Sequence, residues 1–464
     1  MMVFNISGSI KVGDPCDSKI FDAPFTSTAS DFFINDTAMF VATGGTRDGT
    51  SYRENADGFS VFSKNSWLNF NPLLKPIADN NFYLNINCVA LDSRTGKLYA
   101  GSYWAGILQV ENGRVTKTYD KTNSLLRGGI GDAARERISD MAFDKNGNLW
   151  VSNSTAANPL VVLKPDGTWR QMLPISGGAN GTIQMVIDSF SGYKWLTVRG
   201  TGSGILVYDE GKSIDDLTDD QFRFLDASTL PRELQSASVT SLAFDLNGQL
   251  WVGTTSGVAV YRNCGNPFKE GCKAEQVASE LGGIGEFLLR EQQVNCITID
   301  GANRIWFGTN NGIFVQTEGG RKAVAKFDVE NSPLLSNNVT ALSIRDNTGE
   351  VFIGTDKGLM VYKTDAIVGG EFNKAAAFAY PNPVRPDYQG SIAIKGLARD
   401  ATIKITDING NLVYETRSLG GQAIWDGRDF SGQRAATGVY LVYAANATNF
   451  GASDAIVTKI LFVN

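Results

Sequence analysis

Residues 239–261 read VTSLAFDLNGQLWVGTTSGVAVY, and the order of residue types in this stretch decides the fold. A strand-like apolar segment comes first, and DLNG follows, whose Asp, Asn and Gly are typical of a tight turn. A second strand-like segment carries Trp251, and a third begins at Gly257, a residue that tolerates the backbone conformations needed after a tight turn. The stretch predicts three antiparallel strands joined by short turns.

The same arrangement recurs through most of the chain. Matching segments occupy residues 30–43, 86–102, 138–153, 182–198, 294–309 and 339–355. Each copy has one aromatic residue on its second strand, about 52 positions from the next on average, and the set is Phe40, Tyr99, Trp150, Trp195, Trp251, Trp306 and Phe352. A third strand follows each pair, and a more polar fourth strand follows in most copies. Seven such repeats predict an all-β fold with a seven-bladed β-propeller of four-stranded blades over residues 1–363.

Two features of the repeats have a simple structural interpretation. The aromatic residues are expected to pack between adjacent blades. The turn after the first strand carries an aspartate in five copies: Asp92, Asp144, Asp188, Asp245 and Asp300. An aspartate there bonds its own backbone two residues further on, which we favour over calcium binding because the dense Asp-x-Asp spacing of calcium loops is absent.

Closure of the ring needs a strand from the N-terminus. The last copy has no fourth strand after Tyr362, and residues 3–12, VFNISGSIKV, could supply it. The alternative is that residues 3–12 form a loose tail.

A second domain follows a change of composition. Residues 364–378 are interpreted as a linker. Residues 379–464 then contain six or seven short alternating strands with regular turns, which predicts an immunoglobulin-like β-sandwich.

Composition excludes several classes of function. The 464 residues include no histidine, which removes Ser-His-Asp, Cys-His and HExxH chemistry and the commonest metal ligand. The net charge of -6 argues against a nucleic-acid partner. No apolar run is long enough for a transmembrane helix, and the given N-terminus shows no signal peptide. We expect no metal and no cofactor.

The five cysteines leave the redox state open. Cys264 and Cys272 flank the turn-like stretch GNPFKEG, so they could close a hairpin disulfide in an oxidising compartment, or remain free thiols. Cys88 and Cys296 occupy matching repeat positions and are expected to be small core residues. Cys16 has no obvious partner.

Function in a propeller depends on the segments that are not repeated. Two connections share a submotif, GGIGDAARER at 128–137 and GGIGEFLLRE at 282–291, which lacks the Lys-Ser or Lys-Thr of a phosphate loop. We favour a shared structural element over a ligand site. The loops between second and third strands carry Tyr or Trp beside Arg, a combination suited to binding a sugar or peptide by stacking and forked hydrogen bonds. The candidate ligand-binding residues are Tyr52, Arg53, Tyr103, Trp104 and Arg199.

Both parts of the chain resemble known families. Residues 230–261 and 334–362 resemble the two-component-regulator propeller repeat of Bacteroidetes. YPNPV at 380–384, the pattern I-x-I-T-D-x-N-G-x-L-V at 403–413, WDG at 425–427, TGVY at 437–440 and the final Lys-Ile-Leu resemble the type IX secretion sorting domain. The combination is similar to the PorZ-like surface components of the type IX secretion system. The resemblance implies a retained sorting domain, binding of anionic lipopolysaccharide, service to the sortase that anchors cargo, and a further propeller on the N-terminal side.

The function that follows is a non-catalytic binding and scaffold protein of the type IX secretion apparatus, at the cell surface or secreted. One alternative is the oligosaccharide-sensing periplasmic propeller of a two-component regulator. Another is a secreted propeller enzyme acting on polysaccharide, which would need a pair of carboxylates. No acidic pair stands apart from the turn aspartates in the sequence, so we expect no enzyme activity.

Overall fold

The computed structural model forms two compact units. The residues it describes are 2–4, 22–45, 55–172, 181–199, 203–234, 238–262, 264, 266–278, 287–374, 376–446 and 456–463. The first unit comprises Met1–Ile299, Ile305–Ser343 and Phe352–Val361, and the second comprises Asp300–Arg304, Ile344–Val351 and Tyr362–Asn464. The predicted domain boundaries at 363 and 378 stay predictions. No helix among the described residues has the length and apolar character needed to cross a membrane.

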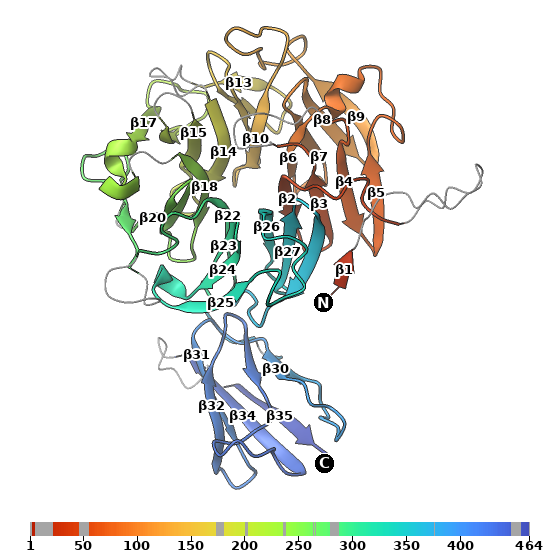
Figure 1. Ribbon diagram of the computed structural model, residues 1–464, viewed down its shortest axis with the longest axis vertical. Helices are drawn as coiled ribbons and strands as arrows, with labels where there is room; N and C mark the ends of the chain where they lie inside the picture. Colours follow the sequence, from red (N-terminus) through yellow and green to blue (C-terminus); the bar gives the residue numbers. More distant parts are fainter. Residues whose placement is uncertain are drawn as a thin grey trace, which may run out of the picture. The chain divides into compact units, whose positions relative to one another are not determined.

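Within the described residues, seven four-stranded antiparallel sheets form a ring (Figure 1), which confirms the predicted propeller. From the inside outward, blades one to four are β2 (Asp31–Ile34), β3 (Ala38–Ala42), β4 (Phe59–Ser63) and β5 (Ser66–Phe70); β6 (Ile86–Leu91), β7 (Leu98–Ser102), β8 (Gly106–Glu111) and β9 (Arg114–Tyr119); β10 (Ile138–Phe143), β11 (Leu149–Asn153), β12 (Leu160–Leu163) and β13 (Trp169–Gln171); and β14 (Gly181–Ile187), β15 (Lys194–Arg199), β16 (Gly204–Asp209) and β17 (Gln221–Asp226). Blades five to seven are β18 (Val239–Phe244), β19 (Leu250–Thr254), β20 (Gly257–Tyr261) and β21 (Glu275–Gln276); β22 (Val294–Ile299), β23 (Ile305–Thr309), β24 (Gly312–Gln316) and β25 (Ala323–Phe327); and β26 (Val339–Arg345), β27 (Glu350–Thr355), β28 (Gly358–Lys363) and β1 (Met2–Phe4).

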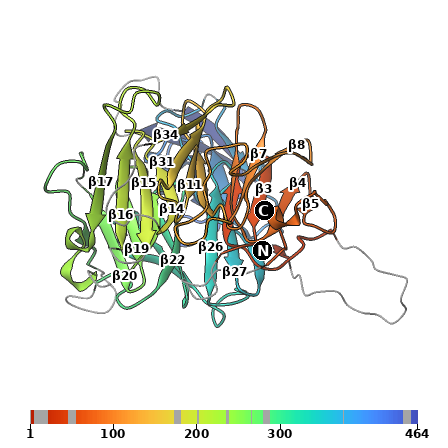
Figure 2. The ribbon, with the colours of Figure 1, turned by 90° about the horizontal axis from the view of Figure 1, so that it is seen from above.

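The seventh blade joins both ends of the ring. Its outer strand is β1, which pairs antiparallel with β28 so that Val3 stands opposite Met360. Figures 1 and 2 both show the N-terminus beside this blade. Residues 5–12 of the predicted closing segment lie outside the described residues.

Polar side chains connect each inner strand to the backbone of the next blade. Five inner strands contain a register shift near their start, which turns side chains at this point toward the following blade. The connecting residues are Ser30 and Asp31, Asn87, Asp140, Gln184, Thr240, Asn295 and Thr340, named here the inner clasp. The last of these closes the circle, because Thr340 Oγ1 donates to the Ala29 carbonyl at 2.8 Å.

The repeat aromatics pack as expected. All seven are buried, and four of them contact an aromatic ring of the following blade: Tyr99 with Phe143, Trp150 with Tyr208, Trp195 with Phe244 and Trp251 with Phe307. Each blade is therefore held to its neighbour by an apolar layer as well as by the inner clasp.

The turn aspartates bond their own backbone. Asp245 Oδ1 accepts from the Asn247 and Gln249 N–H groups, and its other oxygen accepts from Trp251 Nε1 at 3.1 Å. Asp144 bonds Asn146, Asn148 and Trp150 in the same way. The aspartate thus ties the turn to the buried aromatic of the next strand. No group of three or more Cys, Asp or Glu that could hold a metal ion occurs among the described residues.

Glycine at the start of the third strand meets a steric requirement. Gly106 and Gly312 have φ of 95° and 103°, in the region that favours glycine. A Cβ at either position would collide with the carbonyl oxygen that ends the fourth strand, that of Tyr119 or Phe327. The repeated glycines of the sequence therefore mark the close approach of third and fourth strands.

The second unit contains the predicted sandwich. Its strands are β29 (Phe378–Tyr380), β30 (Ile392–Lys395) and β33 (Gln422–Trp425) in one sheet and β32 (Leu412–Arg417), β31 (Ala401–Thr406), β34 (Gly438–Asn446) and β35 (Ile456–Phe462) in the other. Trp425 is fully buried between the sheets, with ring contacts to Tyr440 and Phe462. Asn382 of the YPNPV segment bonds the β35 backbone at Lys459 and Leu461, so its amide satisfies backbone groups at the edge of the sheet.

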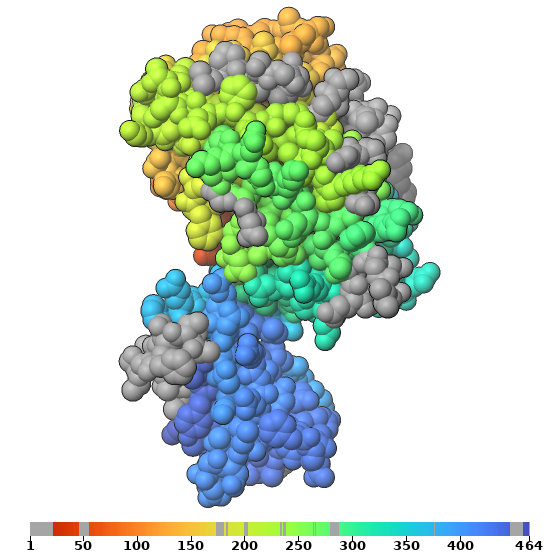
Figure 3. Space-filling model, turned by 90° about the vertical axis from the view of Figure 1, so that its left-hand side faces the viewer, coloured from red at the N-terminus to blue at the C-terminus, as the bar shows by residue number. Residues whose placement is uncertain are grey.

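Cys264 and Cys272 form a disulfide that closes the hairpin between β20 and β21. Phe268 in this hairpin packs edge-on against Tyr193 of blade four, with ring centroids 5.2 Å apart. Arg223 of β17 donates to the Pro267 carbonyl at 2.9 Å. The hairpin therefore holds blade five against blade four, and Figure 3 faces this side of the ring, with residues 203–278 in yellow-green to green.

Candidate functional site

The structure brings together two predicted features that are separate in the sequence. Tyr103 and Trp104 lie in the turn between β7 and β8, and the 128–137 insert connects β9 to β10. In an antiparallel blade these two connections share one face of the ring. Tyr52 and Arg53 lie outside the described residues, as does the side chain of Arg199, the last residue of β15.

Two arginines of the insert cover the two predicted aromatics. The Arg135 guanidinium lies 3.6 Å from the centroid of the Trp104 ring, and that of Arg137 lies 5.6 Å from the Tyr103 ring. Tyr103 is buried and Trp104 is partly buried. One face of the Trp104 ring is therefore covered by the Arg135 guanidinium. A cation–π contact of this kind stabilises the folded state by about 1–2 kcal/mol.

Asp132 holds the two arginines side by side. It pairs with Arg137 at 2.6 Å and with Arg135 at 3.3 Å. Although partial burial acts in the opposite direction, the two guanidinium groups hold the pKa of Asp132 below its ordinary value. We name Tyr103, Trp104, Asp132, Arg135 and Arg137 the aromatic–arginine cluster. In this cluster the forked donors of two arginines are engaged by one internal carboxylate.

The second copy of the submotif has different chemistry at equivalent positions. Leu288 and Leu289 are buried in the core shared by blades five and six, where the first copy has Ala134 and Arg135. Both copies make backbone bonds to the turn before a third strand, from Gly106 to Glu136 and from Glu291 to Ser256. The described residues of both copies thus pack beside the turn before a third strand, but Leu289 and Glu291 stand where the first copy has Arg135 and Arg137. The contrast of AARER with FLLRE is the sequence signal that could have identified the cluster.

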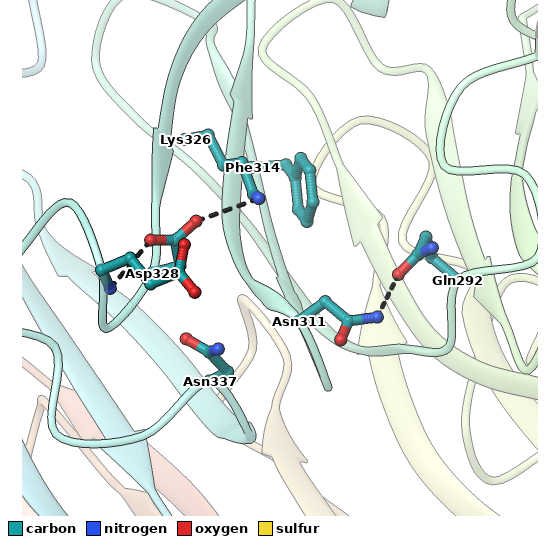
Figure 4. Close-up of a pocket in the computed structure, with 7 residues that line it drawn as sticks. Gln292, Asn311, Phe314, Lys326, Asp328 and Asn337 are labelled. Atoms are coloured by element: carbon teal, nitrogen blue, oxygen red, sulfur yellow. Dashed lines mark hydrogen bonds and ion pairs between the residues drawn. The ribbon is translucent and has the colours of Figure 1, made fainter.

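A pocket of about 330 Å³ opens on blade six. Its lining is Gln292, Asn311, Phe314, Lys326, Asp328, Glu330 and Asn337 (Figure 4). Asn311 comes from the β23–β24 turn, Phe314 from β24 and Lys326 from β25, while Gln292 and Asn337 precede β22 and β26. The sequence analysis did not identify this pocket, although the doublets Gln292-Gln293, Asn310-Asn311 and Asn337-Asn338 mark three connections of one blade.

The charges of this pocket are largely paired within it. Lys326 Nζ lies 3.0 Å from Asp328, and the Asp328 carboxylate also accepts from the Glu330 and Asn331 N–H groups. Lys326, followed by these backbone donors, holds the pKa of Asp328 below its ordinary value, although partial burial acts against it. The Lys326 ammonium also lies 5.5 Å from the Phe314 ring centroid. Asn311 Nδ2 donates to Gln292 Oε1 at 2.5 Å.

Two inner-clasp carboxylates correct an expectation from the sequence. The sequence showed no acidic pair apart from the turn aspartates, yet Asp31 and Asp140 lie on inner strands close enough to interact electrostatically. Burial raises the pKa of Asp31 to about 6, and burial followed by the Asp31 charge raises that of Asp140. Both carboxylates accept backbone N–H groups of the following blade, Val89 for Asp31 and Met185 for Asp140. Their hydrogen bonds give them a structural role between blades.

Comparison with known sequences finds one propeller repeat. The family model described as two component regulator propeller matches residues 288–311, which run from the second insert into the β23–β24 turn. No curated protein matches the chain with significant similarity.

Solved structures match the chain over nearly its whole length. PorZ of Porphyromonas gingivalis, described as an essential bacterial surface component of the type-IX secretion system, matches 97% of this chain with a TM-score of 0.71 and 24% identity. The extracellular domain of BT3049 from B. thetaiotaomicron, assigned to a hybrid two component system, matches 96% with a TM-score of 0.51 and 15% identity. The chain spans 61% of the PorZ chain and 57% of the BT3049 chain. In fold, the chain is similar to PorZ and to the extracellular propellers of two-component systems.

Proposed function

We propose that this chain is a non-catalytic binding and scaffold protein that acts at the cell surface with the type IX secretion system. The observation that carries the proposal is the joint architecture, since a propeller followed by a sandwich matches PorZ over 97% of the chain. The disulfide between Cys264 and Cys272 supports an extracytoplasmic location, because such bonds persist in oxidising compartments. The expected partners are type IX secretion components, including the sortase.

The fate of the C-terminal module on cells tests this role. A surface-retained chain that still contains Lys459, identified by mass spectrometry of surface-labelled protein, is the expected result. Co-purification with the sortase after mild crosslinking would support the partnership. Cleavage within residues 364–378, with release of the sandwich, would identify the chain as ordinary cargo and contradict the proposal.

The aromatic–arginine cluster is the proposed binding surface for an anionic glycan such as lipopolysaccharide. Arg135 and Arg137 present forked donors, and a phosphate or carboxylate on the ligand could replace Asp132 as their partner. Trp104 adds an aromatic edge for a sugar ring.

Binding of purified lipopolysaccharide to matched variants tests this surface. Arg135→Ala should weaken binding about tenfold, since a charged hydrogen bond contributes roughly 1.5–3 kcal/mol. Trp104→Ala should also weaken binding, because it removes the ring that contacts Arg135 and the sugar. Arg114→Ala is the control, because Arg114 is an exposed arginine of the same blade outside the cluster. Equal affinities for all three variants and the parent chain would reject this placement.

A sensor role is the second candidate. The match of residues 288–311 to the two component regulator propeller and the similarity to BT3049 favour it. A sensor of this class would be expected in the periplasm rather than on the cell surface. Protease accessibility on intact cells therefore separates the two candidates.

A further inference from the structure

The pocket on blade six differs in chemistry from the aromatic–arginine cluster. Its polar lining is dominated by side-chain amides, those of Gln292, Asn311 and Asn337. Its cation, Lys326, is already paired with Asp328 at 3.0 Å, and the remaining lining charge is the exposed Glu330 carboxylate. An anionic ligand would have to displace Asp328, which the Glu330 and Asn331 N–H groups also hold, and it would meet the Glu330 carboxylate.

The amides are held in place but keep bonding capacity. Asn337 Oδ1 accepts from the Val329 N–H at 2.9 Å, and its backbone carbonyl accepts from Gly312 N–H at 2.8 Å. Asn311 and Gln292 share one hydrogen bond, and each amide offers donors and an acceptor beyond it.

One aromatic ring completes the pocket. Figure 4 shows Phe314 between the Lys326 ammonium on one side and the Asn311–Gln292 pair on the other. Phe314 is the single apolar side chain of the lining and is partly buried. A peptide side chain would therefore find little apolar surface here, whereas a sugar needs one ring face for its C–H groups and mixed donors and acceptors for its hydroxyls.

We propose that the blade-six pocket binds a neutral pyranose unit of a glycan, with Phe314 against the sugar ring and Asn311, Gln292 and Asn337 on its hydroxyls. The site is separate from the anionic-glycan surface proposed above. The pocket volume of about 330 Å³ suits a ligand of one or two sugar rings. The inference stands on the lining of this pocket, so it holds whether or not the chain serves type IX secretion.

Saturation-transfer NMR and calorimetry on the full chain test the proposal. The probes are the neutral methyl pyranosides of glucose, galactose, mannose and N-acetylglucosamine, with methyl glucuronide as the anionic arm and acetyl-Gly-Asn-Gly-amide as the peptide arm. At least one neutral pyranoside should bind, and the glucuronide should bind more weakly than the glucoside.

Variants locate the binding. Asn311→Ala should weaken the neutral pyranoside up to about tenfold, which corresponds to loss of one or two hydrogen bonds. Phe314→Leu keeps an apolar residue but removes the flat ring, so it should weaken binding of the neutral pyranoside in calorimetry. Lys357→Ala is the matched control, because Lys357 occupies the same turn position in blade seven and is also exposed. Thermal unfolding verifies that each variant is folded.

Three outcomes would overturn the proposal. One is that no neutral pyranoside binds the folded parent chain at millimolar concentration. Another is that Asn311→Ala and Lys357→Ala bind with the affinity of the parent chain. The third is that the peptide binds and the pyranosides do not, which would make the pocket a peptide site. The lipopolysaccharide experiment tests the aromatic–arginine cluster alone, so its failure would not decide whether the blade-six pocket binds a pyranose.

Discussion

Lys194 is a buried cation at a position that is apolar in the other blades. It begins the second strand of blade four, where the others have Met39, Leu98, Leu149, Leu250, Ile305 and Val351. Its side chain is 0% exposed, with Nζ paired to Glu210 and 3.9 Å from the centroid of the Trp150 ring. Burial lowers the pKa of Lys194, although Glu210 opposes the shift. The blade therefore bears a desolvation cost that an apolar residue would avoid.

Replacing Lys194 by leucine should not destabilise the protein. Buried ion pairs often contribute nothing net, and Glu210, which is partly exposed, can recover solvent once its partner is gone. We expect Lys194→Leu to leave the free energy of unfolding unchanged or to raise it by up to about 3 kcal/mol. Glu210→Ala should lower it, because the buried ammonium loses its partner. Denaturant titration measures both variants, and a loss above about 2 kcal/mol for Lys194→Leu would contradict the argument.

Asp31 should make the stability of the propeller depend on pH. Its folded-state pKa of about 6 lies above the ordinary value of 3.8, so the folded state binds the proton more tightly than the unfolded state. This contribution is fully present below about pH 4 and is lost as the pH rises through 6. Asp31→Asn keeps an oxygen for the Val89 N–H and should raise stability at pH 7 by up to about 3 kcal/mol, with little gain at pH 4.

Unfolding curves at pH 4 and pH 7 check this prediction. Asp36→Asn is the control, because Asp36 is exposed in the turn that follows the same strand. A parallel shift of Asp31→Asn at both pH values would show that the effect comes from packing rather than from the charge.

At the scale of the element, the Cys264–Cys272 hairpin compensates for a short outer strand. β21 has two residues, whereas the outer strands of blades two and four have six. The disulfide closes the hairpin, and Phe268 and Pro267 contact Tyr193 and Arg223 of blade four. The hairpin thus provides inter-blade contacts that a full strand would otherwise supply.

Removing the disulfide should destabilise the chain moderately. Closing a loop of this length lowers the entropy of the unfolded chain by the equivalent of about 2–3 kcal/mol. The double variant Cys264→Ser, Cys272→Ser should therefore unfold at a lower temperature than the parent chain, and a reductant should lower the parent to the same value. The double variant itself is the control, since its unfolding temperature should not respond to the reductant. If the parent chain unfolds at the same temperature with and without reductant, the disulfide does not stabilise the chain and the prediction is wrong.

At the scale of the whole propeller, closure joins segments at opposite ends of its sequence. Thr340 Oγ1 bonds Ala29 across 311 residues, and β1 completes the sheet of β28. Elsewhere in the ring the chain runs directly from the outer strand of one blade to the inner strand of the next, and this covalent connection limits how far neighbouring blades can move apart. Between blades seven and one, the connecting chain leads from β1, and β1 is attached to the rest of blade seven only by its pairing with β28, at Met2, Val3 and Phe4 among the described residues. The apolar contacts and the Thr340 bond between the two inner strands therefore hold this junction together.

Thr340→Val should loosen this junction more than an equivalent change elsewhere. Each threonine-to-valine change removes one hydrogen bond, which costs about 1 kcal/mol. Thr240→Val is the matched control, because Thr240 Oγ1 makes the same type of bond between blades five and six. Hydrogen exchange of the β2 and β26 amides should accelerate in Thr340→Val, whereas Thr240→Val should affect β18 and β22 less. Equal acceleration at both junctions would mean that closure is no weaker than the rest of the ring.

The sequence by itself determined the propeller, its seven inner pairs and the sandwich. Alternation, turn aspartates and one aromatic per repeat are local signals, because strands and turns depend on neighbouring residues. The sequence also placed Tyr103 and Trp104 in the turn between the second and third strands of blade two, and it identified the likeness of residues 128–137 to residues 282–291.

Only the tertiary structure decided which side chains meet. Arg135 and Trp104 are 31 positions apart in the chain yet stack at 3.6 Å, and the pocket gathers amides from three separate connections of blade six. Asp31 and Asp140 are 109 positions apart in the sequence, and they interact because both lie on inner strands of the ring. The physical reason is that the geometry of the blades and the lengths of the turns decide which residues of different strands and connections come into contact. The local pattern of each repeat depends on neighbouring residues and does not specify these contacts.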